Sequence, residues 1–405
     1  MKIVGIVAEY NPFHLGHAYQ ITKTRELLGE DCAIVSVMSG DFVQRGEPAL
    51  YSKYARSEAA VRCGADLVLE LPVQVSVSSA ERFARGAVEI LGRLGCVTHL
   101  SFGSESGEIS ALEKTAEACL SPRFHALVKT YLETGCSYPV ARSAALQKLL
   151  GKADFTRTAN DNLGIEYIKA IKELGYSITP IAIKRQGAMH DEHSQEAMKS
   201  GSQLRQMVQE GDSIAESVPE PAQEIYVREQ AAGRGPVYPE LLEQAMLSRL
   251  RMLPESAYAA LPDAAEGLEH KLYTACRTKT NLRDIYDYVK SKRYTHARIR
   301  RMTMNAILGV TRSDYEGDSA YARVLALNER GAKVLKLAKE QSSIPVLSKP
   351  AMARGMDDAA LTAFTKTADA HDLYVLAYGN AEARTGEKDW ITSPLFVDGA
   401  DFTNR

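Results

Sequence analysis

The sequence has no apolar run that approaches the roughly 18 residues needed to span a membrane. Its opening segment, residues 1–7, is apolar but stops at Glu9, as a buried strand does and a secretory signal does not. The six cysteines are scattered and form no Cys-x-x-Cys pair, so we expect neither a disulfide framework nor a zinc knuckle. These absences favour a cytoplasmic protein with buried thiols and no membrane association.

An excess of charge of one sign is also absent, because 49 lysines and arginines oppose 51 aspartates and glutamates and the net charge is −2. Bulk charge therefore gives no sign of nucleic-acid binding, and any basic surface must be local. Internal repeats and low-complexity segments are absent as well. A chain of 405 residues, 45% of them hydrophobic, predicts two or three domains, at roughly 100–200 residues per domain.

Short apolar runs rich in valine and isoleucine alternate with amphipathic stretches through the first hundred residues. They predict strands at residues 3–8, 33–38, 66–71 and 97–102, with helices at 14–28, 53–63 and 80–94 between and after them. Strands without polar alternation, separated by helices, are typical of a parallel sheet buried on both faces. We therefore expect a doubly wound, Rossmann-like α/β domain that binds its ligands at the carboxyl ends of the strands.

The pattern after residue 108 is mainly helical, with a fifth strand at 177–184 that returns to the sheet. Pro219–Pro221 and the glycine- and proline-containing segment Gly233–Pro236 mark a boundary. We expect a catalytic domain at residues 1–220 and a mainly α-helical region at 221–405. A helix at 332–341 and a short strand at 344–347 leave open a small α/β tail from about residue 330.

The first predicted strand runs directly into an HxGH motif, His14-Leu15-Gly16-His17. In this strand–loop–helix context, backbone N–H groups at the helix start can hold phosphate. His14 and His17 would face the same side, and Gly16 would let a nucleotide approach the backbone. Two imidazole N–H donors and the helix dipole could stabilise the negative charge that grows on the oxygens of an α-phosphate when a nucleophile attacks it. Taken alone, the motif also fits a pair of surface or metal-binding histidines.

A second motif, Ser200-Gly201-Ser202-Gln203-Leu204-Arg205, opens a helix after the fifth strand. It looks like the S-x-S/T-x-x-R signature that accompanies HxGH in nucleotidyltransferases, where amides, hydroxyls and the arginine bind the β- and γ-phosphates. Alone, it fits an ordinary serine cap with a solvated arginine. The two motifs together predict an ATP-dependent, nucleotidyltransferase-type enzyme, with Gly103, Lys184 and Arg185 at the same strand ends.

Two further segments carry clusters of charged residues. His190-Asp191-Glu192-His193 could hold a metal, but a catalytic zinc usually needs a third protein ligand that no spacing here supplies, so we predict no metal site. Residues 290–301 contain six lysines and arginines, with Tyr294 and His296 between them, and no acidic side chain. Such a stripe is typical of RNA-binding surfaces, although a solvated helix face gives the same pattern. Because the whole chain has a net charge of −2, this local concentration of basic side chains favours the interpretation as an RNA-binding surface.

Five segments resemble the bacterial tRNA(Met) cytidine acetate ligases. They are Glu9–His17, Ser39–Pro48, Asn162–Tyr167, Lys184-Arg185-Gln186-Gly187 and Ser291–Thr295. The resemblance extends through at least residue 310, and the segment at 39–48 is much more specific than HxGH. The sequence departs from the family at Leu15, Asp41, Asp161 and Met189, none of which removes a phosphate ligand.

The resemblance implies a two-step reaction. Acetate attacks the α-phosphate of ATP to give acetyl-adenylate, and N4 of cytidine 34 in the anticodon of elongator tRNA(Met) then attacks the acetyl carbonyl and releases AMP. Mg²⁺ is expected to accompany the ATP phosphates, held largely through phosphate and water. No obligate protein partner is expected.

The resemblance and the motifs together give a set of candidate site residues. The catalytic candidates are His14, His17, Asp41 and Arg205. The ATP-binding candidates are Val7, Ala8, Glu9, Tyr10, Asn11, Pro12, Phe13, His14, Leu15, Gly16, His17, Gln20, Gly103, Asn162, Lys184, Arg185, Ser200 and Ser202. The tRNA-binding candidates are Lys279, Arg283, Lys290, Lys292, Arg293, Tyr294, Arg298, Arg300 and Arg301. Asp41, Gln44, Arg45 and Glu47 form either a surface turn or the acetate and cytidine end of the pocket.

Two other functions fit the same residues. A small-molecule adenylyltransferase would use both phosphate motifs but would not need the basic stripe. A tRNA-binding protein with a vestigial nucleotide site would not need intact His14, His17 and Arg205. The residues alone leave the acyl donor, the target nucleotide and the oligomeric state open.

Overall fold

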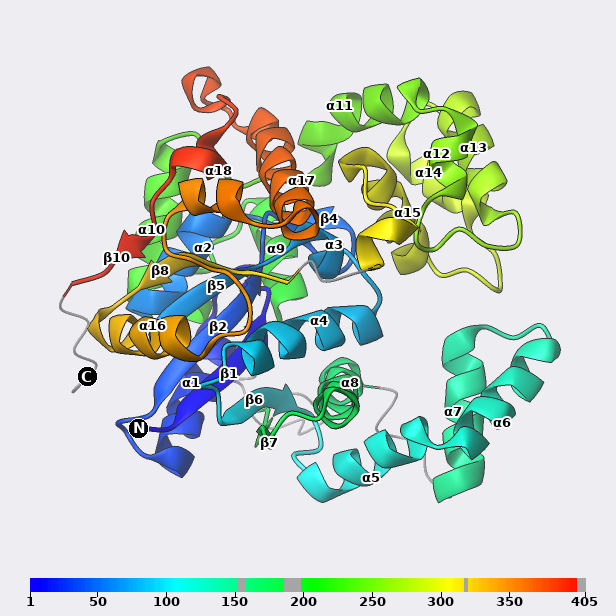
Figure 1. The fold of residues 1–405 in the computed structure, drawn as a ribbon. Helices are drawn as coiled ribbons and strands as arrows, with labels where there is room; N and C mark the ends of the chain where they lie inside the picture. Colours follow the sequence, from blue (N-terminus) through cyan, green and yellow to red (C-terminus); the bar gives the residue numbers. More distant parts are fainter. Residues whose placement is uncertain (152–157, 186–197, 317–319, 399–405) are drawn as a thin grey trace.

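The computed structural model describes residues 1–151, 158–185, 198–316 and 320–398. Within these residues, an eight-stranded sheet forms the centre of the molecule (Figure 1). Its strands are β1 (Ile3–Ala8), β2 (Ala33–Ser39), β5 (Leu67–Leu71), β6 (His99–Ser104), β7 (Thr179–Lys184), β8 (Ala322–Leu327), β9 (Val346–Leu347) and β10 (Leu395–Phe396). The order is β10-β8-β5-β2-β1-β6-β7, with β9 also paired to β8. Neighbouring strands are parallel except β5 and β8, which are antiparallel.

Helices cover both faces of this sheet, which confirms the doubly wound α/β fold predicted from the apolar runs. One face packs against α4 (Ala80–Arg93), α5 (Ile109–Leu120), α8 (Ala159–Leu174) and α16 (Glu329–Gln341). The other packs against α1 (Leu15–Leu28), α2 (Lys53–Arg62), α9 (Gly201–Glu210) and α10 (Glu220–Ala231). β2 and β5 are buried along their whole length, as strands covered on both faces must be.

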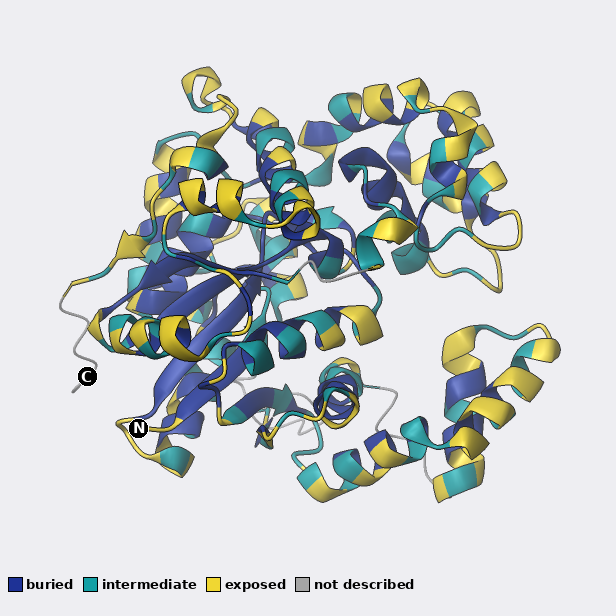
Figure 2. Ribbon diagram, in the orientation of Figure 1, coloured by how far each residue is buried: buried dark blue, intermediate teal, exposed yellow. Residues whose placement is uncertain are grey.

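Two groups of helices extend from the sheet. The first, α6 (Pro122–Glu133) and α7 (Tyr138–Leu150), follows α5 and precedes α8. The second has its own core and comprises α11 (Pro239–Met252), α12 (Glu255–Ala259), α13 (Leu268–Thr278), α14 (Leu282–Val289) and α15 (His296–Leu308). Their outer surfaces are largely exposed (Figure 2). No helix in the described parts of the chain is long and apolar enough to cross a membrane.

Short elements join the second group, here called the helical lobe, to the sheet. A two-stranded antiparallel hairpin of β3 (Phe42–Val43) and β4 (Glu47–Pro48) follows β2. Gly46 at its turn has φ of 75°, and a Cβ there would lie 2.7 Å from the backbone nitrogen of Arg301 in α15. α3 (Val73–Ser76), α17 (Asp358–Tyr374) and α18 (Lys388–Ile391) complete the fold, and α3 and α17 pack on the core of the helical lobe.

The end of the chain differs from the separate α/β tail that the sequence left open. β8, β9 and β10 belong to the central sheet, and β8 extends it beyond β5. The sequence did not predict β8, because Arg323 interrupts its short apolar run and nothing local shows that this side chain is buried. The division of the chain at about residue 220 stays a prediction.

Arg323 is buried because it belongs to a cluster of four charged side chains, Lys53, Glu70, Arg323 and Asp389. Lys53 Nζ lies 2.6 Å from Glu70 Oε1 and also contacts Asp389. One Arg323 nitrogen lies 2.8 Å from Glu70 Oε2 and 2.7 Å from Asp389 Oδ2. None of the four side chains is more than 2% exposed. Two cations thus neutralise two carboxylates, and this buried ion cluster joins α2, β5, β8 and α18.

Candidate functional site

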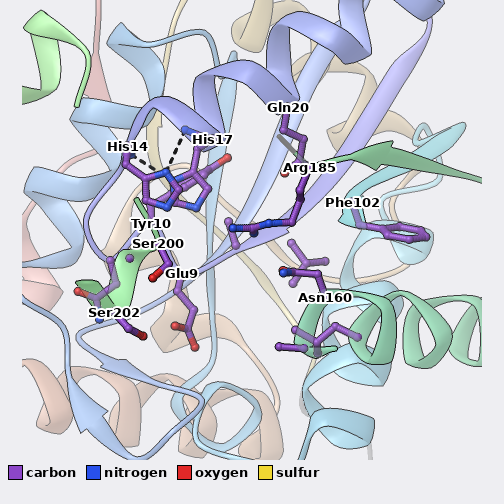
Figure 3. Close-up of a pocket in the computed structure, with 18 of the residues that line it drawn as sticks. Glu9, Tyr10, His14, His17, Gln20, Phe102, Asn160, Arg185, Ser200 and Ser202 are labelled. Carbon is purple, nitrogen blue, oxygen red and sulfur yellow. Dashed lines mark hydrogen bonds between the residues drawn. The ribbon is translucent and has the colours of Figure 1, made fainter. Parts of the chain in front are cut away.

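A cavity of about 470 Å³ lies at the carboxyl ends of β1, β6 and β7 (Figure 3). This is the edge at which an open α/β sheet binds its ligands. The loop after β1, the starts of α1, α8 and α9, and the β3–β4 hairpin form its walls. It contains the sequence motifs that predicted a nucleotide site.

The loop after β1 is held in a strained conformation. Tyr10 has φ of 46°, a left-handed conformation that costs a non-glycine residue about 1–3 kcal/mol. Its ring lies 4.9 Å, centroid to centroid, from the rings of Phe13 and His17, and its hydroxyl lies 2.8 Å from Ser36 Oγ. These contacts fix the turn that delivers the two histidines to the cavity.

His14 and His17 both use Nδ1 to cap the start of α1. His14 Nδ1 accepts a hydrogen bond from the Gly16 amide at 3.0 Å, and His17 Nδ1 accepts one from the His14 amide at 3.2 Å. The two rings are stacked with centroids 3.8 Å apart. A neutral imidazole whose Nδ1 accepts a hydrogen bond carries its proton on Nε2. Neither Nε2–H has a partner in the part of the chain that the structure describes, so both can donate to a ligand.

The surroundings keep both imidazoles neutral. Burial, with the charges of Arg185 and Arg205, lowers the pKa of His14 to about 4. Burial, with His14 and Arg185, also lowers the pKa of His17 well below its ordinary value. The site therefore offers neutral donors beside two cationic side chains, a combination suited to a polyanion.

We expect His14 and His17 to remain neutral in an NMR pH titration from pH 8 to 5.5. The exposed His270, whose pKa is raised by its hydrogen bond to Glu255, should protonate at a higher pH and serves as the internal reference. Since the folded pKa of His14 is depressed, its contribution to stability is complete above the ordinary value of 6.5 and is lost as the pH falls towards about 4. Protonation of either ring near pH 6.5 would contradict this assignment.

The start of α9 forms a second wall of polar groups. Ser200 caps the helix, since its Oγ accepts from the Gln203 amide at 3.3 Å while Gln203 Oε1 accepts from the Ser200 amide at 2.7 Å. Arg205 donates to the Asn11 carbonyl at 2.8 Å and to Ser202 Oγ at 3.1 Å. The Gly201 and Ser202 amides have no partner among the described residues, so they and the Ser202 hydroxyl can bind phosphate oxygens.

Arg185 and Gly103 lie at the ends of β7 and β6. A Cβ on Gly103 would lie 3.6 Å from Arg185 Cγ, an ordinary contact, so the protein itself does not require glycine there. The Arg185 side chain extends towards the two imidazoles (Figure 3) and has no hydrogen bond or ion pair among the described residues. Arg45 of the hairpin also lines the cavity without such a partner in the described chain. Two guanidinium groups are thus available to a ligand.

The start of α8 forms the opposite wall with apolar and amide side chains. Arg142 of α7 donates to Asn162 Oδ1, which leaves the Asn162 amide nitrogen for a ligand. Asn160 Nδ2 donates to Glu105 Oε1 at 2.6 Å. Gly164 allows the Phe102 ring to pack on α8, since a Cβ there would lie 2.5 Å from that ring. This wall offers a flat apolar surface with amide groups, which suits a nucleobase and ribose.

Most of the candidate site residues meet at this cavity. It is lined by Val7, Ala8, Glu9, Tyr10, Asn11, His14, Gly16, His17, Gln20, Gly103, Asn162, Arg185, Ser200, Ser202 and Arg205. Pro12, Phe13, Leu15 and Lys184 do not line it: Phe13 is buried behind the loop, and Leu15 and Lys184 are exposed. That the lining residues bind ATP stays a prediction.

Sequence reasoning missed part of the lining. The missed residues include Tyr19, Phe83, Phe102, Asn160, Leu163, Tyr167 and Lys199. Phe102 and Leu163 are next to the selected residues Gly103 and Asn162, and Asn160 is two positions before Asn162. Their place beside the end of β6 and the start of α8 was the available signal.

Asp41 was expected to take part in the chemistry, but it is not among the residues that line the cavity, and its catalytic role stays a prediction. Its Oδ2 lies 2.8 Å from His371 Nδ1, and its Oδ1 accepts from the Lys53 amide at 2.8 Å. Although burial opposes the charged form, His371 and Lys53 hold the pKa of Asp41 below its ordinary value. Asp41 therefore fixes the hairpin from inside the protein, whereas Gln44 and Arg45 of the same turn reach the cavity.

The basic stretch of the helical lobe is partly neutralised. Arg293 pairs with Glu266 at 2.7 Å, Arg300 with Glu47 at 2.5 Å, and Arg301 lies 3.9 Å from Asp263. Tyr294 and Arg298 are bonded to the same acidic segment, and Lys279 Nζ lies 4.6 Å from the Tyr288 ring centroid. Arg283, Lys290 and Lys292 are exposed without an ion pair in the described chain. These acidic partners come from segments distant in sequence, so the sequence of residues 290–301 alone could not predict that its arginines are neutralised.

The potential metal-binding segment at 190–193 lies outside the described residues, as do Gln186, Gly187 and Met189 of the family motifs. Among the residues that the structure does describe, no group of three or more histidine, cysteine or acidic side chains could hold a metal ion.

Known proteins are similar to this chain over most of its length. The model of the HIGH Nucleotidyl Transferase family matches residues 1–389. The tRNA(Met) cytidine acetate ligase of Acetivibrio thermocellus is 34% identical, over 98% of this chain and 100% of that protein. The enzyme of the same name from Fervidobacterium nodosum is 38% identical, over 88% of this chain and 86% of that protein.

Solved structures agree with the sequence comparisons. Thermotoga maritima TmcAL bound with alpha-thio ATP superposes with a TM-score of 0.90 at 33% identity, over 98% of this chain and 100% of that one. The same protein without ligand gives a TM-score of 0.91 at 34% identity. The chain therefore belongs to the HIGH nucleotidyl transferase family, among relatives that are tRNA(Met) cytidine acetate ligases.

Proposed function

We propose that this chain is a tRNA(Met) cytidine acetate ligase, which activates acetate with ATP and transfers the acetyl group to N4 of cytidine 34 in elongator tRNA(Met). The full-length similarity to enzymes of that name supports the reaction, and the neighbour with a bound ATP analogue supports ATP as the nucleotide. Within the chain, the observation that carries the proposal is the pair of neutral imidazoles with free Nε2–H groups beside Arg185 and Arg205. The cytoplasm, where tRNA is found, is the proposed location.

In the first step, the residues need only position the reactants and neutralise charge. The Nε2–H groups of His14 and His17 donate to oxygens of the α-phosphate as acetate attacks it and pyrophosphate leaves. The amides at the start of α9, with Arg205, bind the β- and γ-phosphates. One carboxylate lines the cavity among the described residues, so this part of the chain offers no cage of acids for Mg²⁺. Mg²⁺, if it accompanies the nucleotide, would be held largely by phosphate and water and would add positive charge to the triphosphate.

In the second step, the anticodon must reach the acetyl-adenylate. The hairpin provides the connection, because Gln44 and Arg45 line the cavity while Glu47 pairs with Arg300 of α15. We propose that the tRNA backbone binds the basic side of the helical lobe, with Arg283, Lys290 and Lys292 as the cations free of acidic partners in the described chain.

The test is incubation of the protein with ATP, magnesium, labelled acetate and bulk tRNA, followed by mass spectrometry of the nucleosides. We expect acetylated cytidine that depends on acetate and ATP and forms without acetyl-coenzyme A. Pyrophosphate release without a tRNA product would indicate a small-molecule adenylyltransferase instead. Binding of tRNA without any turnover of ATP would indicate a non-catalytic tRNA-binding protein.

Replacement of Gly16 by alanine is expected to weaken ATP turnover about 100-fold, the size of effect that a displacement of about 1 Å in an active site produces. The added Cβ would lie 2.8 Å from His14 Cε1, so the ring must move and lose its hydrogen bond from the residue 16 amide. Acetate-dependent ATP–pyrophosphate exchange measures the loss. Gly355→Ala is the control, because a Cβ there meets nothing within 4 Å. Equal rates in the two variants would contradict this view of the HxGH glycine.

A further inference from the structure

Glu9 is the one carboxylate among the described residues that line the cavity. It directly follows β1, at the start of the loop that leads to the histidines. The sequence motif placed it with the ATP-binding residues, but a carboxylate repels a triphosphate. Its position therefore calls for another explanation.

The two oxygens of Glu9 have different surroundings. Oε1 accepts a hydrogen bond from the backbone N–H of Gln44 at 3.0 Å, which fixes the carboxylate against the β3–β4 hairpin. Oε2 has no hydrogen-bond partner among the described residues and is not sealed from the cavity. The side chain extends away from His14 and His17 (Figure 3). One oxygen is thus anchored and the other is available.

The hairpin that anchors Glu9 is also the part of the cavity wall joined to the helical lobe. Its turn packs against the backbone of α15 at Gly46, and Glu47 pairs with Arg300. The adenine-binding wall that we propose, with Gly103 and Asn162, belongs to β6 and α8. Glu9 therefore lies on the side of the cavity from which an RNA base held by the helical lobe would enter.

The acyl-transfer step requires a group that accepts a proton. The exocyclic amine of cytosine must lose a proton as it becomes an amide, and few side chains in the cavity can take it. His14 and His17 use Nδ1 as hydrogen-bond acceptors and carry their protons on Nε2. Arg45, Arg185 and Arg205 are donors only. Among the imidazoles, guanidinium groups and carboxylates of the described lining, Glu9 is the acceptor with a free oxygen.

We propose that Glu9 is the general base of the acyl-transfer step and takes the N4 proton on Oε2, a role that rests on the proposed function. The N4 lone pair forms the bond to the acetyl carbon. The bond from that carbon to the phosphate oxygen breaks, and its electron pair leaves with AMP. The proton lost from N4 passes to Glu9 and then to solvent.

The charges around Glu9 fit this role. Burial raises the pKa of its carboxyl group, and the Gln44 amide with Arg205, Arg45 and Arg56 opposes that rise. Tyr167 of α8 also lines the cavity, and burial together with the charge of Glu9 raises the pKa of its hydroxyl, which is therefore neutral. A carboxylate whose pKa moves towards the working pH is a stronger base than an ordinary surface acid. The same three arginines keep the charged form available.

The experiment separates the two steps with Glu9→Gln, which keeps the shape of the side chain. Acetate-dependent ATP–pyrophosphate exchange reports adenylate formation, and transfer to tRNA in a single turnover from the enzyme-bound adenylate reports the second step. We expect exchange within about threefold of wild type and transfer lowered about 100-fold, the usual size of a general-base contribution. Wild-type transfer should fall at acidic pH as Glu9 is protonated, whereas the variant should lose this dependence. Glu9→Asp should recover part of the rate.

Glu26→Gln is the matched control, because Glu26 is an exposed residue of α1 that pairs with Lys23 and does not line the cavity. Transfer at the wild-type rate in Glu9→Gln would overturn the proposal. Equal losses of exchange and transfer would also overturn it, since Glu9 would then serve ATP binding or folding. A wild-type protein without acetate-dependent exchange would overturn the proposed function itself, and with it this role of Glu9.

Discussion

Replacement of His14 or His17 by alanine is expected to lower the rate of adenylate formation by about 100- to 1000-fold, the usual loss when one preorganised donor to a developing oxyanion is removed. The reason is geometric, because each ring spends Nδ1 on capping α1 and presents Nε2–H to the cavity. The rate is measured as acetate-dependent ATP–pyrophosphate exchange at saturating ATP. The effect should fall on kcat more than on KM, since the donors act on charge that grows in the transition state.

The double variant tests whether the two rings act as one unit. Their centroids lie 3.8 Å apart and the His14 amide donates to His17, so removal of either ring disturbs the other. We expect the double variant to lose less activity than the product of the single losses. His99→Ala, a change near the amino end of β6, is the control. Single losses below about tenfold would show that the imidazoles are not the main donors.

Replacement of Arg323 by methionine is expected to reduce the free energy of unfolding by about 3–5 kcal/mol, the usual cost when one partner of a buried ion pair is removed. The change would leave Glu70 and Asp389 with only Lys53 to neutralise them, all in the protein interior. Urea unfolding of the full chain measures the loss. Lys333→Met on the exposed side of α16 is the control and should change stability by less than about 0.5 kcal/mol.

The same cluster predicts the direction of the pH dependence. Although burial opposes the charged form, Lys53 and Arg323 depress the pKa of Asp389. A carboxylate with a depressed folded pKa contributes stability that is present above its unfolded pKa of about 3.9 and is lost as the pH falls below it. The difference in stability between wild type and Arg323→Met should therefore shrink in acid. A difference that stays constant from pH 7 to 3 would show that lost packing, not charge, explains the effect.

Where local pattern determines structure, the sequence was sufficient. β1 and β2 were predicted to within one residue, because their valine- and isoleucine-rich runs have no polar alternation. The strand at Ala322–Leu327 was missed, because the charge on Arg323 is compensated by residues more than 60 positions away in either direction. Periodicity carries no information about such partners.

For the site too, residues that are close together in the chain could be predicted, and residues brought together by packing could not. His14, Gly16 and His17 stand together in the chain, so their spacing and the strand before them were enough to predict a phosphate site. Phe102 and Asn160 reach the cavity only because β6 and α8 pack together, with the Phe102 ring against Gly164. The burial of Asp41 could not be predicted for a related reason, because its partner His371 lies far along the chain.

The position of β8 also has a consequence for how the protein is made. The hydrogen-bonding edge of β5 is complete only when residues 322–327 have left the ribosome, long after the other strands of the sheet core. Until then the nascent chain carries an open sheet edge, of the kind that pairs with neighbouring chains. A product that stops early would keep that edge and would also bury Lys53 and Glu70 without Arg323 and Asp389. Incomplete translation products would thus be recognisable to proteases and chaperones as misfolded, although their nucleotide-binding motifs had already been synthesised.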